Sequence, residues 1–449
     1  MRNNIVHPGA GELTYEIRAI VEIADQLRAL GVATRMENIG DPVSKGERLP
    51  AWLKQIVSNL ALDDSSYAYC PSKGVLETRE FLAARVNARG GIRIGADDIL
   101  FFNGLGDAIQ KVYGLLRRET RVIGPSPTYS THSSGEAAHA GQHPVCYRLD
   151  PERNWFPDLA DLRLSVKYNP AISGILIINP DNPTGAVYPE QVLREMVAIA
   201  REYDLFIVAD EIYANLVFDG QRTAQLADVI GDVPALSMKG ISKEVPWPGS
   251  RCGWIEVYNA DKDATFARYV RSLADSKMVE VCSTTMPQKA IPLLLQHPEY
   301  QGYLDQRRRR YARHADIAYQ LLRAVPGLRV NRTNGAFYMS VVFEDGVLDA
   351  TQRLPIPNAQ VRELVERITS ADGVALDKRF VYYLLASTGI CVVPLSSFWT
   401  PLQGFRLTLL EQDEGVFTET IRTIAENVTA YLCSSASTLR RAPTTRPAA

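Results

Sequence analysis

The sequence lacks the cysteine and histidine patterns that mark disulfide-rich and metal-binding proteins. Its six cysteines are scattered, with no CxxC pair. This spacing disfavours a disulfide framework and a structural zinc site, and it is typical of proteins from a reducing cytoplasm, where we expect this chain to act. His139 and His143 stand four apart without a glutamate beside His139. We interpret them as loop histidines and expect no metal.

Long apolar runs and a strong net charge are also missing. No run approaches the ~18 apolar residues of a membrane helix. The stretch MRNNIVHPGAGELTYEIR lacks the apolar core of a secretory signal. The formal net charge of −2 gives no field that would gather nucleic acid or anionic membrane. We therefore expect neither a nucleic acid nor a membrane as partner.

The middle of the chain alternates short apolar runs with amphipathic stretches. GILIINP (174–180) and LFIVAD (205–210) predict buried strands, and the helical spacing of apolar residues over 189–204 predicts a helix between them. Such a unit implies parallel strands joined by a right-handed crossover. Further strands are expected at 121–127, 234–240 and 252–258. The pattern indicates an α/β core with helices on both faces of a mostly parallel sheet.

The last third of the chain has a different pattern. Residues 303–325 predict one long helix, and we interpret its Arg307 to Arg310 run as a solvated face. Strand-like runs with helices between them follow at 335–343, 389–394 and 405–410, which indicates a smaller α+β domain. The expected domains are an N-terminal segment of the small domain at 1–55, a large domain at 56–305, a small C-terminal domain at 306–433 and a disordered tail at 434–449.

Polar residues follow several of the predicted strands, where open parallel sheets bind ligands. NGLGDA begins a helix after one strand, and its backbone N–H groups could hold an anion, although a plain tight turn fits this segment as well. NPDNPTG (179–185) predicts a fixed turn that presents Asn182. Asp210 ends a strand and needs a partner, which could be a helix N-terminus or a protonated ring nitrogen. Lys243 follows the strand at 234–240.

Together these groups suit pyridoxal 5′-phosphate, because they supply an anion cup, an acid, hydrogen-bond donors and an amine. The order of YCPSKGVLETRE, NGLGDA, SPTY, NPDNPTG, VADEIY, SKEVPWPGSR, GAFY and FRL resembles the class I and II aminotransferases of fold type I, over roughly residues 15–430. The resemblance implies a three-layer α/β fold, a homodimer with active sites at its interface, and pyridoxal phosphate as cofactor.

The resemblance also implies roles for single residues. Lys243 is similar to the lysine that forms a Schiff base with the cofactor, Asp210 to the acid beside the ring nitrogen, and Tyr213 and Asn182 to the pair at the ring hydroxyl. The remaining cofactor contacts implied are Tyr129 on the ring face, Leu105, Gly106, Asp107, Ser242 and Arg251 at the phosphate, and Tyr69 from the neighbouring subunit. Arg406, with Gly40 and Asn182, resembles the group that holds the substrate carboxylate.

Three features depart from the family pattern. Gly240 stands where the family often has a phosphate-binding serine, three positions before the lysine. The segment VSKGERLP lacks the usual aromatic residue and carries Lys45 and Arg48, and the lysine loop holds Trp247. These departures leave substrate identity and reaction type open.

Two functions remain compatible with the residues. The first is transfer of an amino group between an L-amino acid and a 2-oxo acid. The alternative is elimination, replacement or carbon–carbon bond formation at Cβ or Cγ of an activated amino acid, such as a sulfonium amino acid, on the same scaffold. The cofactor motifs do not separate these two enzymes, because both begin by removing the same Cα proton. A non-catalytic cofactor sensor is a third possibility, which would need a fused DNA-binding domain.

Overall fold

The computed structural model describes residues 5–13, 16–218, 220 and 223–435, so residues 436–449 of the predicted tail lie outside the described residues. The described chain divides into two compact units. Of the described residues, unit 1 contains those in 5–13, 41–312 and 334–337, and unit 2 contains those in 16–40, 313–333 and 338–435. The helix α11 (Tyr300–Leu322) runs through the boundary between residues 312 and 313.

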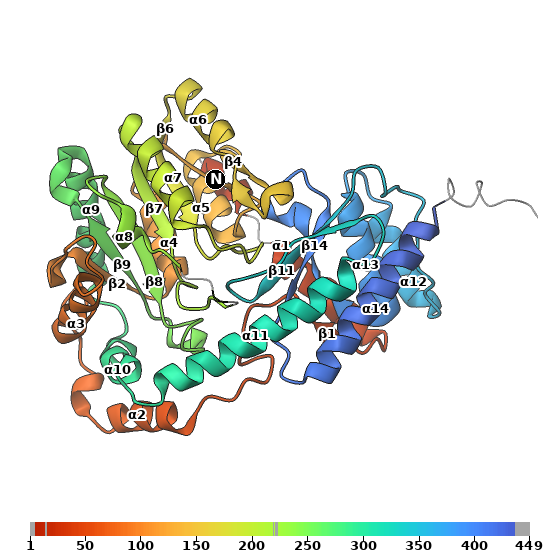
Figure 1. Cartoon of the computed structure of the whole chain (residues 1–449), viewed down its shortest axis with the longest axis horizontal. Helices are drawn as coiled ribbons and strands as arrows, with labels where there is room; N and C mark the ends of the chain where they lie inside the picture. The colour runs from red at the N-terminus through yellow and green to blue at the C-terminus, as the bar shows by residue number, and fades with distance from the viewer. Residues whose placement is uncertain (1–4, 14–15, 219, 221–222, 436–449) are drawn as a thin grey trace, which may run out of the picture. The chain divides into compact units, whose positions relative to one another are not determined.

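Unit 1 is built on an eight-stranded sheet in the order β2-β9-β8-β7-β6-β3-β4-β5 (Figure 1). The strands from β8 to β4 are parallel, whereas β9 is antiparallel to β8 and β2, and β5 is antiparallel to β4. The strands are β2 (Ile99–Phe102), β3 (Arg121–Ser126), β4 (Cys146–Asp150), β5 (Phe156–Pro157), β6 (Ile172–Ile178), β7 (Phe206–Asp210), β8 (Ala235–Gly240) and β9 (Gly253–Tyr258).

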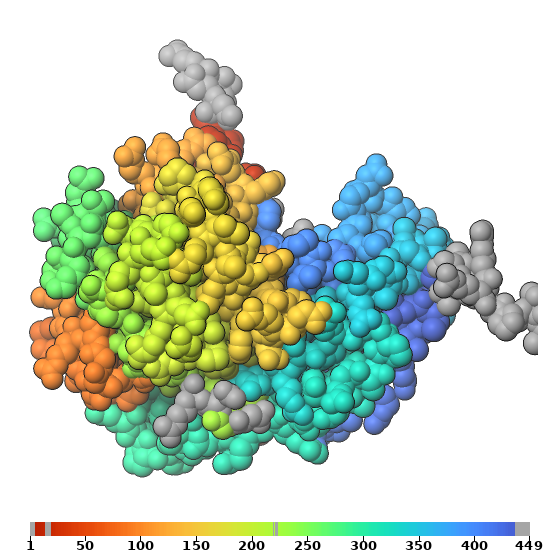
Figure 2. Space-filling model, turned by 45° about the horizontal axis from the view of Figure 1, so that its top comes forward, coloured from red at the N-terminus to blue at the C-terminus, as the bar shows by residue number. Residues whose placement is uncertain are grey.

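Helices cover this sheet because successive side chains of its strands alternate between two apolar faces. Leu176, Ile178 and Met238 pack against α4 and α9 in one core cluster. Helices α6 and α7 pack on each other (Figure 1), and their segment, coloured yellow, forms much of the surface seen in Figure 2. The helices of unit 1 are α2 (Ala51–Ala61), α3 (Leu76–Asn87), α4 (Leu105–Gly114), α5 (Ser130–Ala140), α6 (Leu159–Tyr168), α7 (Glu190–Glu202), α8 (Leu226–Val229), α9 (Ala264–Glu280), α10 (Thr285–Leu295) and the first part of α11.

Unit 2 contains a four-stranded antiparallel sheet in the order β10-β11-β14-β13 and a parallel pair, β1 with β12. Its strands are β1 (Arg35–Met36), β10 (Leu328–Val330), β11 (Tyr338–Phe343), β12 (Ile390–Cys391), β13 (Val393–Pro394) and β14 (Gly404–Thr408). Its helices are α1 (Glu16–Ala29), α12 (Ala359–Thr369), α13 (Leu376–Thr388), α14 (Glu414–Cys433) and the last part of α11. The α/β core and the additional α+β unit confirm the predicted fold class.

Two local predictions were wrong. His139 lies in the last turn of α5, not in a loop, and its Nε2 lies 2.9 Å from the carbonyl oxygen of Arg117. Arg307 was predicted to lie on a solvated face, but its side chain is only 1% exposed. In the part of the chain that is described, no helix is long and apolar enough to cross a membrane.

Candidate active site

The candidate site of unit 1 lies at the carboxyl ends of its parallel strands. Asp210 is the last residue of β7, and Lys243 follows the end of β8, the neighbouring strand. Asn182 follows β6, which pairs with β7 on its other side, and Tyr129 follows β3 beyond β6. Because these strands are adjacent and parallel, their ends bring the four residues to one edge of the sheet.

Asp210 is held by a buried chain of hydrogen bonds. His132 Nε2 lies 3.1 Å from Asp210 Oδ2, and Tyr113 Oη lies 3.2 Å from His132 Nδ1. Burial raises the pKa of Tyr113 well above its usual range, so the phenol keeps its proton. A carboxylate can only accept, so Nε2–H toward Asp210, with Nδ1 accepting from the phenol, is the arrangement that satisfies all three groups. The imidazole then presents Nε2–H to the carboxylate, and the backbone N–H of Ile212 donates to Oδ1 at 3.1 Å. Two donors thus fix the carboxylate in place.

A cup for an anion lies at the beginning of α4. Gly104 adopts φ +84°, and a Cβ built on it would come within 2.5 Å of the Arg251 guanidinium. Only glycine therefore lets the guanidinium approach this turn. Leu105 and Gly106 open the helix, where backbone N–H groups and the helix dipole favour a negative ligand.

Asp107 lies in the same first turn, but its carboxylate is engaged within the protein. It accepts a hydrogen bond from the backbone N–H of Asn103 at 3.0 Å and pairs with Lys111. The glycine cradle, the arginine and the helix N-terminus fit a phosphate group.

Lys243 lies against an aromatic pair. Its Nζ lies 5.7 Å from the ring centroid of Phe337, and the rings of Phe337 and Tyr213 meet edge to face at 5.3 Å. Tyr213 is 3% exposed and Asn182 is 4% exposed. Phe337 was not predicted as a site residue. It belongs to the GAFY motif at the start of a predicted strand, and this position could have indicated a role in the site.

The turn that carries Asn182 is fixed by its neighbours. Asp181 Oδ2 accepts hydrogen bonds from the backbone N–H of Thr184 at 3.1 Å and from its hydroxyl at 2.5 Å. Asn179 Oδ1 accepts from the backbone N–H of Tyr188 at 2.8 Å. Burial, together with the charge of Asp210, raises the pKa of Asp181 to about 7.

The remaining predicted residues of unit 1 occupy different surroundings. Tyr129 is half-buried, with its ring 6.3 Å from that of His132. Ser242 is half-buried beside Lys243, and Tyr69 is 84% exposed. A Cβ at Gly240 would lie 3.0 Å from the Cys252 carbonyl oxygen and 3.1 Å from Ile212 Cδ1, so the position has little room for the family's serine.

Gly40 and Arg406 belong to unit 2. Arg406 lies on β14, an inner strand, and is 2% exposed, so it is not a surface arginine on an edge strand. Its guanidinium donates to the carbonyl oxygen of Asn38 and lies 4.4 Å from the ring centroid of Tyr338 and 5.0 Å from that of Phe398. A buried arginine between two aromatic rings is pre-organised to bind a carboxylate.

Lys239 has a structural environment that the sequence did not reveal. Its Nζ lies 3.2 Å from Glu256 Oε2 and 3.5 Å from Glu211 Oε2, and it donates to Gln225 Oε1 at 2.8 Å. Burial opposes the charged lysine, but the two glutamates outweigh burial and raise its pKa. Lys239 therefore belongs to an ion-pair network and is not available as a nucleophile.

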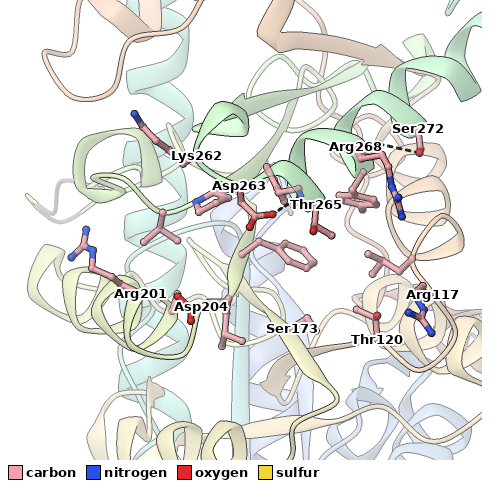
Figure 3. Close-up of a pocket in the computed structure, with 18 of the residues that line it drawn as sticks. Arg117, Thr120, Ser173, Arg201, Asp204, Lys262, Asp263, Thr265, Arg268 and Ser272 are labelled. Carbon is pink, nitrogen blue, oxygen red and sulfur yellow. Dashed lines mark hydrogen bonds between the residues drawn. The ribbon is translucent and has the colours of Figure 1, made fainter.

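A cavity of about 700 Å³ lies elsewhere in unit 1. Thr120, Ser173 and Pro234 line it, and they lie at the amino ends of the strands. Figure 3 shows Arg117 and Thr120 at one end of this cavity and Arg201 and Lys262 at the other. It is therefore distinct from the candidate site at the carboxyl ends.

The fold is that of the fold type I transferases. The chain belongs to the family "Aminotransferase class I and II", whose sequence profile matches residues 38–420. It is 57% identical over 432 residues to an uncharacterized aminotransferase of Methanocaldococcus jannaschii, which covers 96% of this chain and 100% of that protein. It is 31% identical over 329 residues to the glutamate-pyruvate aminotransferase AlaA of Escherichia coli, over 72% of this chain and 79% of the relative.

Solved structures agree with the family. The alanine aminotransferase of Pyrococcus furiosus superposes with a TM-score of 0.80 at 27% identity, over 93% of this chain and 98% of that one. An aspartate aminotransferase variant of Thermus thermophilus, at 23% identity and a TM-score of 0.77, shows the same fold over 95% of this chain and 100% of that one. The chain is an aminotransferase, and none of these relatives favours the lyase or replacement alternative.

Proposed function

We propose that unit 1 binds pyridoxal 5′-phosphate at the carboxyl edge of its sheet and that Lys243 is the reactive lysine. The observation that carries this proposal is the pair of adjacent strand ends: Asp210 closes β7, Lys243 follows β8, and Arg251 lies over the glycine turn that opens α4. When bound, the cofactor supplies an electron-withdrawing ring that stabilises negative charge at the substrate Cα.

The proposed roles follow from the surroundings of each residue. Asp210, oriented by His132, would hold a proton on the ring nitrogen, because its carboxylate is fixed by two donors. Lys243 Nζ would remove the proton from the substrate Cα as a general base and would later give up a proton as a general acid. Further cofactor contacts are proposed for Tyr129, Asn182 and Tyr213 at the ring, and for Leu105, Gly106, Asp107, Ser242 and Arg251 at the phosphate.

The proposed substrates are an L-amino acid and a 2-oxo acid, with the carboxylate bound by Arg406, Gly40 and Asn182. The names of the E. coli and P. furiosus relatives make alanine, and glutamate with pyruvate, the first substrates to test. We also propose a homodimer in which Tyr69 reaches the neighbouring subunit's phosphate, since this ring is 84% exposed in the single chain. The predicted division of the chain into residues 1–55, 56–305, 306–433 and 434–449 and a cytoplasmic location belong to the same proposal.

Reduction with borohydride tests the reactive lysine. We expect purified protein loaded with pyridoxal phosphate to carry the reduced cofactor on Lys243, as found by peptide mapping. The matched control is Lys243→Arg, which should carry no label. A label on Lys239 would contradict the proposal, since that amine is paired with Glu211 and Glu256. A spectral screen of amino acids then tests whether an amine form of the cofactor accumulates, as transamination requires.

A further inference from the structure

The backbone of the lysine loop is held by an arginine that has no predicted role. Arg307 Nη1 donates to the carbonyl oxygen of Lys243 at 2.9 Å and to that of Glu244 at 2.6 Å. Both carbonyls belong to the segment after β8, which ends at Gly240. Charge-assisted hydrogen bonds of this kind are stronger than neutral ones and restrict geometry.

Arg307 is itself fixed on its other sides. Its Nε lies 2.6 Å from Glu47 Oε1, and its Nη2 donates to Tyr311 Oη at 2.9 Å. The guanidinium lies over the rings of Tyr303, at 5.7 Å, and Tyr311, at 5.5 Å. An arginine that is 1% exposed thus has a carboxylate, a phenol and two backbone carbonyl groups around its charge.

Glu47 joins this arrangement to the segment that departs from the family pattern. It is 5% exposed and lies in VSKGERLP. Besides Arg307, its carboxylate accepts from Tyr303 Oη at 2.8 Å and from Arg310 Nη2 at 2.7 Å. The negative charge thus balances a buried arginine, and it places the departing segment against the helix that holds the lysine loop.

A second connection runs from the same helix to the next residue of the loop. Glu244 Oε2 accepts from Asn215 Nδ2 at 2.7 Å, and the carbonyl oxygen of Asn215 accepts from Arg308 Nε at 2.7 Å. Successive arginines of α11 therefore reach the loop by two routes, directly to its backbone and indirectly to a side chain. Arg309, between Arg308 and Arg310, is exposed and takes no part.

We propose that Arg307, anchored by Glu47, is a positioning residue that sets the direction of the Lys243 side chain by holding the Lys243 and Glu244 carbonyl groups. This inference rests on the proposed role of Lys243. A reacting group displaced by about 1 Å can lose ~100-fold in rate. Loss of the clamp is therefore expected to act on the proton-transfer step and much less on substrate binding.

The test compares Arg307→Lys, Glu47→Gln and the matched control Arg309→Lys. Lysine keeps the charge but cannot donate to two carbonyls and to Tyr311 from a planar fork. We expect Arg307→Lys to lower kcat by about 10- to 100-fold with KM changed less than about threefold. Glu47→Gln should give a smaller loss in the same direction, and Arg309→Lys should behave as wild type.

Hydrogen exchange of the cofactor-free protein gives a readout that does not depend on activity. We expect faster amide exchange in residues 241–250 of Arg307→Lys, with the strands β6 and β7 unchanged. Unchanged exchange there, or a kcat equal to wild type, would overturn the proposal. A fall in kcat that the fraction of unfolded protein fully accounts for would also overturn it, because unfolded protein lowers the apparent kcat and leaves KM unchanged. If borohydride fails to label Lys243 while the exchange changes as expected, the proposed function fails and the backbone clamp stands.

Discussion

His132 Nε2 lies 3.1 Å from Asp210 Oδ2, so the carboxylate proposed to face the cofactor ring is backed by a buried imidazole. The two residues are 78 positions apart in sequence, and α5 brings them together. The imidazole in turn accepts a hydrogen bond from Tyr113.

Removing the hydrogen bonds from Tyr113 to His132 and from His132 to Asp210 one at a time should weaken catalysis in steps. Tyr113→Phe removes only the outer hydrogen bond, worth about 1 kcal/mol, so kcat should fall by roughly fivefold. His132→Leu leaves Asp210 without its side-chain donor, and we expect a larger fall together with weaker cofactor retention. Steady-state kinetics and cofactor release on dilution measure the two effects. Equal activity of the wild type, Tyr113→Phe and His132→Leu would show that these hydrogen bonds have no part in orienting Asp210.

Arg406→Lys should act on substrate binding. Lysine keeps the charge but loses bidentate geometry and aromatic stacking between Tyr338 and Phe398, so KM for the amino acid should rise at least about tenfold. Initial-rate measurements over a range of amino-acid concentrations give the value. The control is Arg422→Lys on α14, an exposed arginine paired with Glu419. A normal KM for Arg406→Lys would remove the proposed carboxylate role.

Lys239→Met should destabilise unit 1. Removal of the amine leaves Glu211 and Glu256 buried without a charge partner, which typically costs about 3–5 kcal/mol. Chemical denaturation measures the free energy of unfolding. Adding Glu256→Gln should restore part of the loss, whereas Lys262→Met, at an exposed site, should change little. Stability within about 0.5 kcal/mol of wild type for Lys239→Met would contradict the ion-pair interpretation.

Asp181 should make stability depend on pH. Its pKa of about 7 in the folded protein is above its ordinary value of 3.8, so the folded state holds this proton more tightly than the unfolded chain does. The stability that Asp181 contributes to the folded state is present below about pH 4 and is lost as pH rises through 7. Asp181→Asn should therefore flatten the fall in Tm between pH 4 and 7.

The matched control for that experiment is Asp232→Asn. Asp232 is exposed, and its hydrogen bond with Arg201 lowers the pKa of the carboxyl group, so its effect has the opposite sign. We expect it to keep the wild-type fall in Tm between pH 4 and 7. If Asp181→Asn follows the wild-type curve over that range, Asp181 does not hold a proton in the folded protein.

The sequence predicted well the features that depend on neighbours along the chain. The strands β6, β7 and β8 and the turn after β6 follow from apolar runs that end in Asn-Pro, Asp and Gly, so the edge that carries Asn182, Asp210 and Lys243 could be foreseen. His132 could not be foreseen, because its partner is distant in sequence and a histidine in a helix has no pattern of its own. The domain boundaries and the residue roles remain predictions.

Arg307 was misinterpreted because a run of four arginines is usually solvated. The helix nevertheless contained a signal. Buried residues recur along α11 at helical spacing, and Arg307 falls within that stripe. Its members are Tyr300, Leu304, Arg307, Tyr311, Ala315, Ala318 and Leu322. The spacing of this stripe predicts Arg307 on the buried face of the helix, whereas the number of charged residues alone predicts a solvated face.

The crowded surroundings of Gly240 bear on attempts to redesign this enzyme. A side chain there would press on the Cys252 carbonyl and on Ile212, both of which pack tightly beside β8. The single substitution Gly240→Ser would therefore add a hydroxyl group but would also displace the backbone between β8 and β9. A useful exchange would have to enlarge the space first, for example with Ile212→Val, so the two positions form one unit for engineering.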